Sequence, residues 1–172
     1  MPPDPGREVL DVVDAANRVI GHATRAEVHA RGLLHRAVHM LVLNPAGDIY
    51  VQRRALDKDC QPGLWDTSAA GHVDRGEDWA AAARRELAEE LALTGVALEL
   101  LGELSASAAT GNEFVRVYRC RSAREPRPDP HEIMDAGWWR EAALADWMAR
   151  RPDDFTAVFH TVMRLQRASR VA

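Results

Sequence analysis

Three glutamates in one short stretch carry the clearest chemistry in this sequence. Glu86, Glu89 and Glu90 are spaced i, i+3 and i+4, so on a helix their carboxylates share one face. Like charges at this spacing repel, and a bound cation would offset that repulsion. Carboxylate oxygens are the ligands that Mg²⁺ and Mn²⁺ prefer, and Arg85 can pair with one carboxylate and orient it. Taken alone, the cluster fits either a solvated helix face or a divalent-metal site.

The residues around these glutamates predict the element that carries them. The segment 78–91 contains WAAAARRELAEEL, in which alanine, leucine, arginine and glutamate are all good helix formers. A short strand near 66–70 and a turn with Gly71 and Gly76 precede it. We therefore expect the carboxylates on a helix that directly follows a strand and a turn.

The stretch 71–93 resembles the Nudix box, G-x5-E-x7-R-E-U-x-E-E-x-G-U, where U is a bulky aliphatic residue. Leu87 and Leu93 fill its two aliphatic positions. Ala92 stands where the family has its second glycine, which helps the chain to leave the helix. The remaining fixed positions of the motif are filled by Gly71, Glu77, Arg85, Glu86, Glu89 and Glu90.

The resemblance implies a Mg²⁺-dependent hydrolase that acts on a diphosphate linked to another moiety, with Mn²⁺ as a substitute metal. Metal binding lowers the pKa of a bound water and neutralises phosphate oxygens. Arg85 would orient the site, and Glu86 would be a ligand or the base that activates water. The fold implied is the Nudix α/β/α sandwich with a mixed sheet. The implied metal-binding set is the backbone carbonyl of Gly71 with Glu77, Glu86, Glu89 and Glu90.

The preceding stretch, VQRRALDKDCQPGLWDTSAAGHV, is similar to isopentenyl-diphosphate isomerases of the same superfamily. In that family an arginine and a lysine bind the substrate diphosphate, and by position these are Arg54 and Lys58, which otherwise are ordinary loop charges. The isomerases carry a catalytic cysteine where this chain has Ala70. The missing thiol and the complete glutamate set indicate hydrolysis rather than isomerisation.

Three residues outside the box are further candidates. His72 corresponds to a metal-ligand histidine of the isomerases, and Glu113 resembles a downstream glutamate that approaches the metal in both branches. Glu132 is a candidate extra base, because Nudix loops before a tryptophan-bearing strand sometimes supply one. Each also fits a plain structural role. The other histidines, His29 and His35 among them, show no metal-ligand spacing.

The rest of the chain predicts one domain of the α/β or α+β class with a mixed sheet. Residues 1–7 contain three prolines and are expected to form a flexible arm, and residues 8–172 a single Nudix domain. We expect a hairpin over 8–22 and helices over 24–30, 78–91, 142–149 and 155–170. Further strands are expected over 36–43, 48–53, 66–70, 96–106, 113–121 and 133–139.

Composition limits the partners. The 172 residues carry 22 basic and 26 acidic side chains, and a net charge of −4 argues against a nucleic-acid polymer as partner. No run of about 18 apolar residues predicts a membrane span, and the N-terminus lacks a secretory pattern, so a cytoplasmic location is expected. Cys60 and Cys120 are expected as free thiols. The 8–22 hairpin and the C-terminal helix are the segments that could serve a homodimer.

Three functions stay open at this point. The first is a hydrolase for a small diphosphate, with a nucleoside diphosphate or an NDP-linked compound as the expected substrate. The second is an isomerase of isoprenoid-type diphosphates, against which Ala70 argues. The third is a non-catalytic diphosphate-binding module, which would not need Glu86, Glu89 and Glu90 together.

Overall fold

A seven-stranded mixed sheet forms the centre of the computed structural model, which describes residues 5–170. The strand order is β5-β4-β3-β8-β7, with β6 paired to β3 and β9 paired to β4. The pair β3–β8 is parallel and the other pairs are antiparallel, which confirms the expected mixed sheet. The strands are β3 (His35–Leu43), β4 (Ile49–Arg54), β5 (Trp65–Asp66), β6 (Ala69–His72), β7 (Glu99–Leu104), β8 (Glu113–Arg121) and β9 (Ile133–Trp139).

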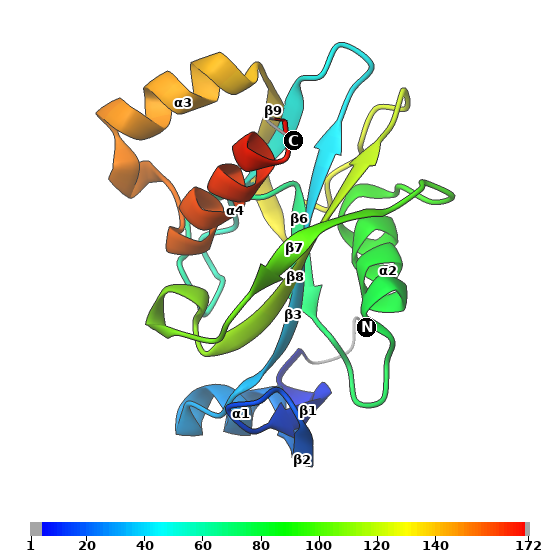
Figure 1. Ribbon diagram of the computed structural model, residues 1–172, viewed down its shortest axis with the longest axis vertical. Coiled ribbons are helices and arrows are strands. Elements are labelled where there is room, and N and C mark those ends of the chain that lie inside the picture. The colour runs from blue at the N-terminus through cyan, green and yellow to red at the C-terminus, as the bar shows by residue number, and fades with distance from the viewer. Residues whose placement is uncertain (1–4, 171–172) are drawn as a thin grey trace.

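Helices cover both faces of this sheet, as Figure 1 shows. Helix α2 (Trp79–Leu91) lies on one face, and α3 (Glu141–Arg150) and α4 (Ala157–Ala168) lie on the other. Neighbouring residues of β3 alternate between two cores, because successive strand side chains point to opposite faces. Met40 packs with α2, whereas Leu41 packs with α3 and α4. This confirms the α/β/α sandwich and explains why β3 is apolar along most of its length.

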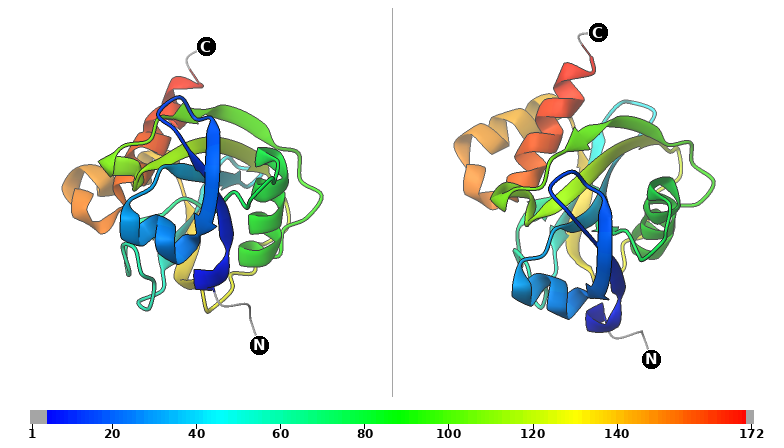
Figure 2. Two further views of the ribbon diagram at one scale, coloured as in Figure 1. Left: turned by 90° about the horizontal axis from the view of Figure 1, so that it is seen from below. Right: turned by 60° about the horizontal axis from the view of Figure 1, so that its bottom comes forward.

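A small N-terminal unit covers one end of the sheet (Figure 1, Figure 2). It contains the hairpin of β1 (Val9–Val13) and β2 (Val19–Thr24), followed by α1 (Arg25–Arg31). The hairpin bonds to the turn after β6, where the Arg75 amide donates to the carbonyl of Val9 at 2.9 Å. Of the arm expected over residues 1–7, Pro5–Arg7 form a 3₁₀ helix, and residues 1–4 lie outside the described chain.

The helix that carries the glutamates begins and ends at identifiable residues. Asp78 caps its N-terminus by accepting from the amides of Ala80 and Ala81. At the other end, Ala92 adopts the left-handed conformation, with φ 53°, that the motif normally assigns to glycine. The substitution therefore leaves the helix end intact, at a conformational cost of about 1–2 kcal/mol.

Helix boundaries elsewhere differ slightly from the predicted ones. The helix expected over 155–170 begins at Ala157, because the side chain of Thr156 accepts from the Phe159 amide and caps it. Within residues 5–170, no helix is long and apolar enough to cross a membrane.

Candidate active site

Helix α2 presents the three glutamates of the motif in different surroundings. Glu86 and Glu90 are 9% and 8% exposed, whereas the side chain of Glu89 is 60% exposed. Gly71 on β6 lies directly against Glu86: a Cβ atom placed on Gly71 would come 2.1 Å from the Glu86 carboxyl group. A side chain at position 71 would therefore force the Glu86 carboxyl group to move.

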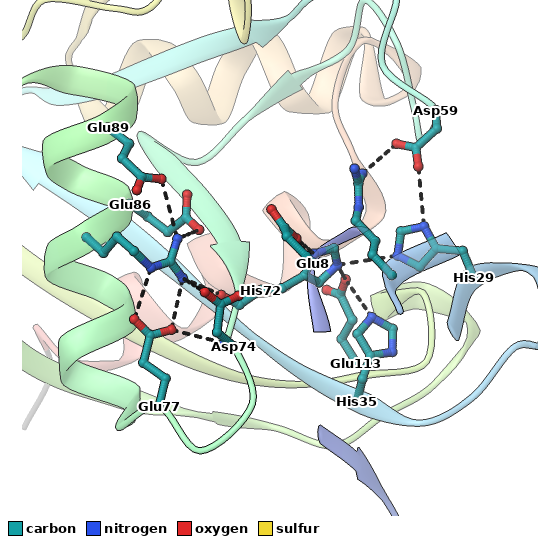
Figure 3. Close-up of polar contacts among 12 residues, drawn as sticks. Glu8, His29, His35, Asp59, His72, Asp74, Glu77, Glu86, Glu89 and Glu113 are labelled. Carbon is teal, nitrogen blue, oxygen red and sulfur yellow. Dashed lines mark hydrogen bonds and ion pairs between the residues drawn. The ribbon is translucent and has the colours of Figure 1, made fainter. Parts of the chain in front are cut away.

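Arg85 joins the carboxylates of Glu77, Glu86 and Glu89, which lie near one another in Figure 3, through its guanidinium. It donates to both carboxylate oxygens of Glu77, at 3.0 and 2.9 Å, in the bidentate geometry typical of strong arginine–carboxylate pairs. It also donates to Glu86 at 2.6 Å and to Glu89 at 3.4 Å, and to the backbone carbonyl of His72 at 3.0 Å. Arg85 thus orients the carboxylates, and both carboxylate oxygens of Glu77 accept hydrogen bonds from Arg85.

Burial changes the acidity of two of the carboxyl groups. It raises the pKa of Glu90 well above its ordinary value, and the nearby charge of Glu86 adds to this effect. Gln52 opposes the rise by donating to Glu90 at 3.0 Å. Burial also raises the pKa of Glu86 to about 7, although Arg85 stabilises its charged form. Two adjacent buried oxygen donors that resist ionisation fit a hard divalent cation, which would stabilise both negative charges.

We expect the stability of the metal-free protein to fall between pH 4.5 and 7. The ordinary pKa of Glu86 is 4.5 and its pKa in the folded protein is about 7, so the folded state binds more protons in this window. The wild type should lose up to about 3 kcal/mol of unfolding free energy there. Urea unfolding in the presence of a chelator measures this loss. Glu86→Gln should show a smaller loss, and equal slopes in both proteins would contradict the assignment.

A second group of polar side chains lies beside the first, and we call it the histidine cluster. The Nε2 atoms of His29 and His72 are 3.3 Å apart, and Glu113 Oε1 lies 3.4 Å from Nε2 of both His35 and His72. Within the described chain, the buried Nε2 of His35 has no hydrogen-bond partner. The members of the histidine cluster are His29 on α1, His35 on β3, His72 on β6 and Glu113 on β8.

The histidine cluster has the donor set of a transition-metal site. Three imidazole nitrogens and the Glu113 carboxylate oxygen converge, and the His35 Nε2 atom, which makes no hydrogen bond among the described residues, is a polar atom that a metal would satisfy. Burial lowers the pKa of His72, but Glu113 and Glu8 outweigh it and raise the value to about 9. Burial likewise raises the pKa of Glu113, but the contacts with His35 and His72 hold it well below its ordinary value.

Sequence spacing missed two members of this group. His29 and His35 show no ligand spacing, yet the fold brings them together, because β3 pairs with both β6 and β8 and α1 leads into β3. The register places His35 opposite Glu113 and His72 opposite Ala37. The structure places Glu113 beside His35 and His72, and its approach to the metal, which the resemblance implies, stays a prediction.

The two predicted phosphate ligands lie at the loop 55–64 between β4 and β5. Lys58 forms an ion pair with Glu132, the candidate base from the loop before β9. Arg54, at the end of β4, donates from Nε to the Cys60 carbonyl at 3.0 Å, and its Nη1 lies 3.7 Å from Asp66. Both cations therefore contact other groups of the protein in this structure, and Glu132 is paired with Lys58.

Comparison with known proteins places this geometry in a family. The NUDIX domain model matches residues 33–159. The chain is 35% identical over 144 residues to an uncharacterized Nudix hydrolase of Nostoc sp., covering 82% of this chain and 85% of that protein. It is 33% identical over 161 residues to an isopentenyl-diphosphate Delta-isomerase of Serratia proteamaculans, covering 91% and 90%.

Solved structures agree with this assignment. A crystal structure from Deinococcus radiodurans superposes with a TM-score of 0.78 at 29% identity, over 92% of this chain and 99% of that one. A MutT NUDIX hydrolase of Burkholderia pseudomallei gives a TM-score of 0.61 at 23% identity, over 75% and 95%, and shows the shared fold. The chain therefore belongs to the NUDIX domain family and is a Nudix hydrolase.

Proposed function

We propose that this protein hydrolyses the diphosphate linkage of a small nucleotide-type molecule, with Mg²⁺ held by the glutamates of α2. The observation that carries the proposal is the joint burial of Glu86 and Glu90 at the point where Gly71 lets α2 touch β6. Mn²⁺ is expected to substitute, because it shares the preference of Mg²⁺ for oxygen ligands.

The residues of the chain divide the work in this proposal. Glu86, Glu89 and Glu90, with the Gly71 carbonyl, would hold the metal, which supplies an activated water and neutralises phosphate oxygens. Arg85 keeps Glu86 and Glu89 aligned through its hydrogen bonds. As the resemblance implies, Glu86 is also the candidate base that accepts a proton from the attacking water.

An isomerase-like activity is the second candidate, and the histidine cluster favours it. By resemblance, His72 matches a metal ligand of the isomerases, and isomerases are among the relatives of this chain. On β6, however, the position that carries cysteine in that family is Ala70, which pairs with His39 and offers no group for proton transfer. We therefore place hydrolysis first. A non-catalytic binding module is third, since binding alone does not require the complete glutamate set.

A hydrolysis screen with Mg²⁺ or Mn²⁺ tests the proposal. The panel contains nucleoside di- and triphosphates, nucleotide sugars, dinucleoside polyphosphates, coenzyme A and isopentenyl diphosphate, with Glu89→Gln as the blank. ADP ribose is included because the Nudix domain of Shewanella oneidensis NrtR was solved in complex with it. Metal-dependent phosphate or nucleotide release from one class supports hydrolysis. Isomerised isopentenyl diphosphate with no release from any compound would favour the second candidate.

We expect Lys58→Ala to raise KM about tenfold and to change kcat little, because a phosphate contact contributes mainly to binding. Steady-state kinetics on the substrate found in the screen measures both constants. Glu132→Gln is the matched control: it also breaks the Lys58–Glu132 pair but keeps the lysine charge. If both variants raise KM equally, the ion pair matters for the loop and Lys58 does not bind phosphate.

The remaining expectations about partners belong to the same proposal. The substrate is a small diphosphate, and a nucleic-acid polymer is not expected at a net charge of −4. Val19 and Ile20 on the hairpin β1–β2 are 52% and 66% exposed and would be the first residues to examine in a homodimer. A cytoplasmic location also stays a prediction.

A further inference from the structure

Each imidazole ring of the histidine cluster has polar neighbours at both of its nitrogen atoms. While their Nε2 atoms face one another or Glu113, each Nδ1 atom faces an oxygen. Figure 3 shows one of these pairs, His29 with Asp59. In metal sites, an oxygen that accepts a hydrogen bond from the ring nitrogen not bound to the metal fixes the tautomer and orientation of the histidine. The three pairs are His29 with Asp59 Oδ2 at 3.3 Å, His35 with the Leu33 carbonyl at 2.9 Å, and His72 with Glu8 Oε2 at 3.5 Å.

Asp59 differs from the other two oxygen donors in where it comes from. It belongs to the loop 55–64, whereas its partner His29 lies on α1. Its second carboxylate oxygen accepts from Arg25, also on α1, at 2.8 Å. The Asp59 carboxylate therefore attaches this loop to α1 at two points, Arg25 and the Nδ1 atom of His29.

The loop attached in this way is the one that carries the predicted phosphate ligands. Lys58 immediately precedes Asp59, and the carbonyl of the next residue, Cys60, accepts from Arg54. Asp59 is thus the chain neighbour of Lys58 and is connected to Arg54 through Cys60 and one hydrogen bond.

We propose that Asp59 is a positioning residue that couples a transition-metal ion in the histidine cluster to the loop 55–64. With Asp59 as acceptor, His29 carries its proton on Nδ1 and leaves the Nε2 lone pair for the metal. A metal bound to Nε2 of His29 would make the Nδ1 proton a stronger donor. Metal binding would therefore strengthen the hydrogen bond from His29 to Asp59 and stabilise the loop 55–64. The functional meaning of this coupling rests on the proposed function, because Lys58 and Arg54 are assigned to phosphate there.

Cobalt binding tests the coupling without any substrate. Co²⁺ titrations, followed by absorption in the presence of excess Mg²⁺ to occupy the carboxylates of α2, compare wild type with Asp59→Ala. We expect Asp59→Ala to weaken Co²⁺ binding 10- to 100-fold, the usual effect of losing such an orienting carboxylate. Asp57→Ala, an exposed carboxylate in the same loop, is the matched control and should bind like wild type. Equal affinity of all three proteins would overturn the proposal.

Hydrogen exchange gives the readout for the loop itself. Co²⁺ should slow amide exchange over residues 55–64 in wild type and in Asp57→Ala, but not in Asp59→Ala. Bound Co²⁺ without protection of the loop in wild type would overturn the coupling. Asp59 is half exposed, its side chain being 51% accessible, so its removal should leave the fold intact, which a thermal melt verifies.

Two outcomes distinguish this proposal from a metal site at Cys60 and from the proposed hydrolysis. His29, Asp59 and Cys60 also lie close enough to share an ion. A thiolate-to-Co²⁺ charge-transfer band that disappears in Cys60→Ser would place the metal there and overturn the proposal. Conversely, Co²⁺ binding that depends on Asp59 and protects the loop would support it even if the substrate screen shows no hydrolysis, in which case the proposed function alone fails.

Discussion

Glu89→Gln is expected to lower kcat by at least about 100-fold, a loss of roughly 3 kcal/mol of transition-state stabilisation. Glu89 is exposed and contacts Arg85 only at 3.4 Å, so it contributes little to folding. The amide keeps the size of the side chain and removes the charge that a Mg²⁺ ligand supplies. The thermal midpoint should therefore stay near that of wild type while turnover collapses.

Glu90→Gln should give the same kinetic result with a different effect on stability. Burial raises the pKa of Glu90 well above its ordinary value, so the uncharged amide resembles the form that the metal-free protein favours. We expect equal or higher stability without metal, together with lost activity. Asp146→Asn, an exposed carboxylate change on α3, is the control for both variants. Wild-type turnover in both glutamate variants would rule out the metal site on α2.

Gly71→Ala is expected to cause the second large effect, because the new methyl group has no space. It would lie 2.1 Å from the Glu86 carboxyl group, so either the side chain or the strand must move. Overpacking of this kind costs about 1–3 kcal/mol of stability. Displacing Glu86 from the metal should also reduce kcat about 100-fold, and urea unfolding and kinetics measure the two effects separately.

Two further variants show whether the clash itself is the cause. Gly21→Ala, also in a strand, adds a methyl group where nothing lies within 4 Å, and it should leave stability and activity nearly unchanged. Adding Glu86→Ala to Gly71→Ala removes the carboxyl group that the new methyl group would meet, so stability should recover while activity stays lost. A double variant no more stable than Gly71→Ala alone would show that the contact with Glu86 does not explain the effect.

The features that the sequence determined by itself are local ones. A helix repeats every 3.6 residues, so the spacing of Glu86, Glu89 and Glu90 places them on one face wherever the helix lies. The composition of 78–91 predicts that helix, and the structure has it at Trp79–Leu91. The apolar run 36–43 is also a property of consecutive residues. It predicts a buried strand, and β3 extends over His35–Leu43.

Contacts between distant segments were decided by the tertiary structure. Lys58 and Glu132 are 74 positions apart, so nothing in their local spacing indicates that the predicted phosphate ligand and the candidate base form an ion pair. The surroundings of the glutamates are of the same kind: Gln52 reaches Glu90 only because β4 and α2 pack on a common core.

The histidine cluster shows this division most clearly. His29, His35 and His72 have no common spacing in the sequence, and Glu113 is linked to a metal only by the resemblance. Strand register brings His35 opposite Glu113 and sets His72 beside them, and α1 adds His29. Spacing along one helix is a property of consecutive residues, whereas register between strands depends on how both faces of the sheet are packed. The carboxylate site can therefore be predicted from the sequence, whereas the histidine cluster as a group becomes visible only in the fold.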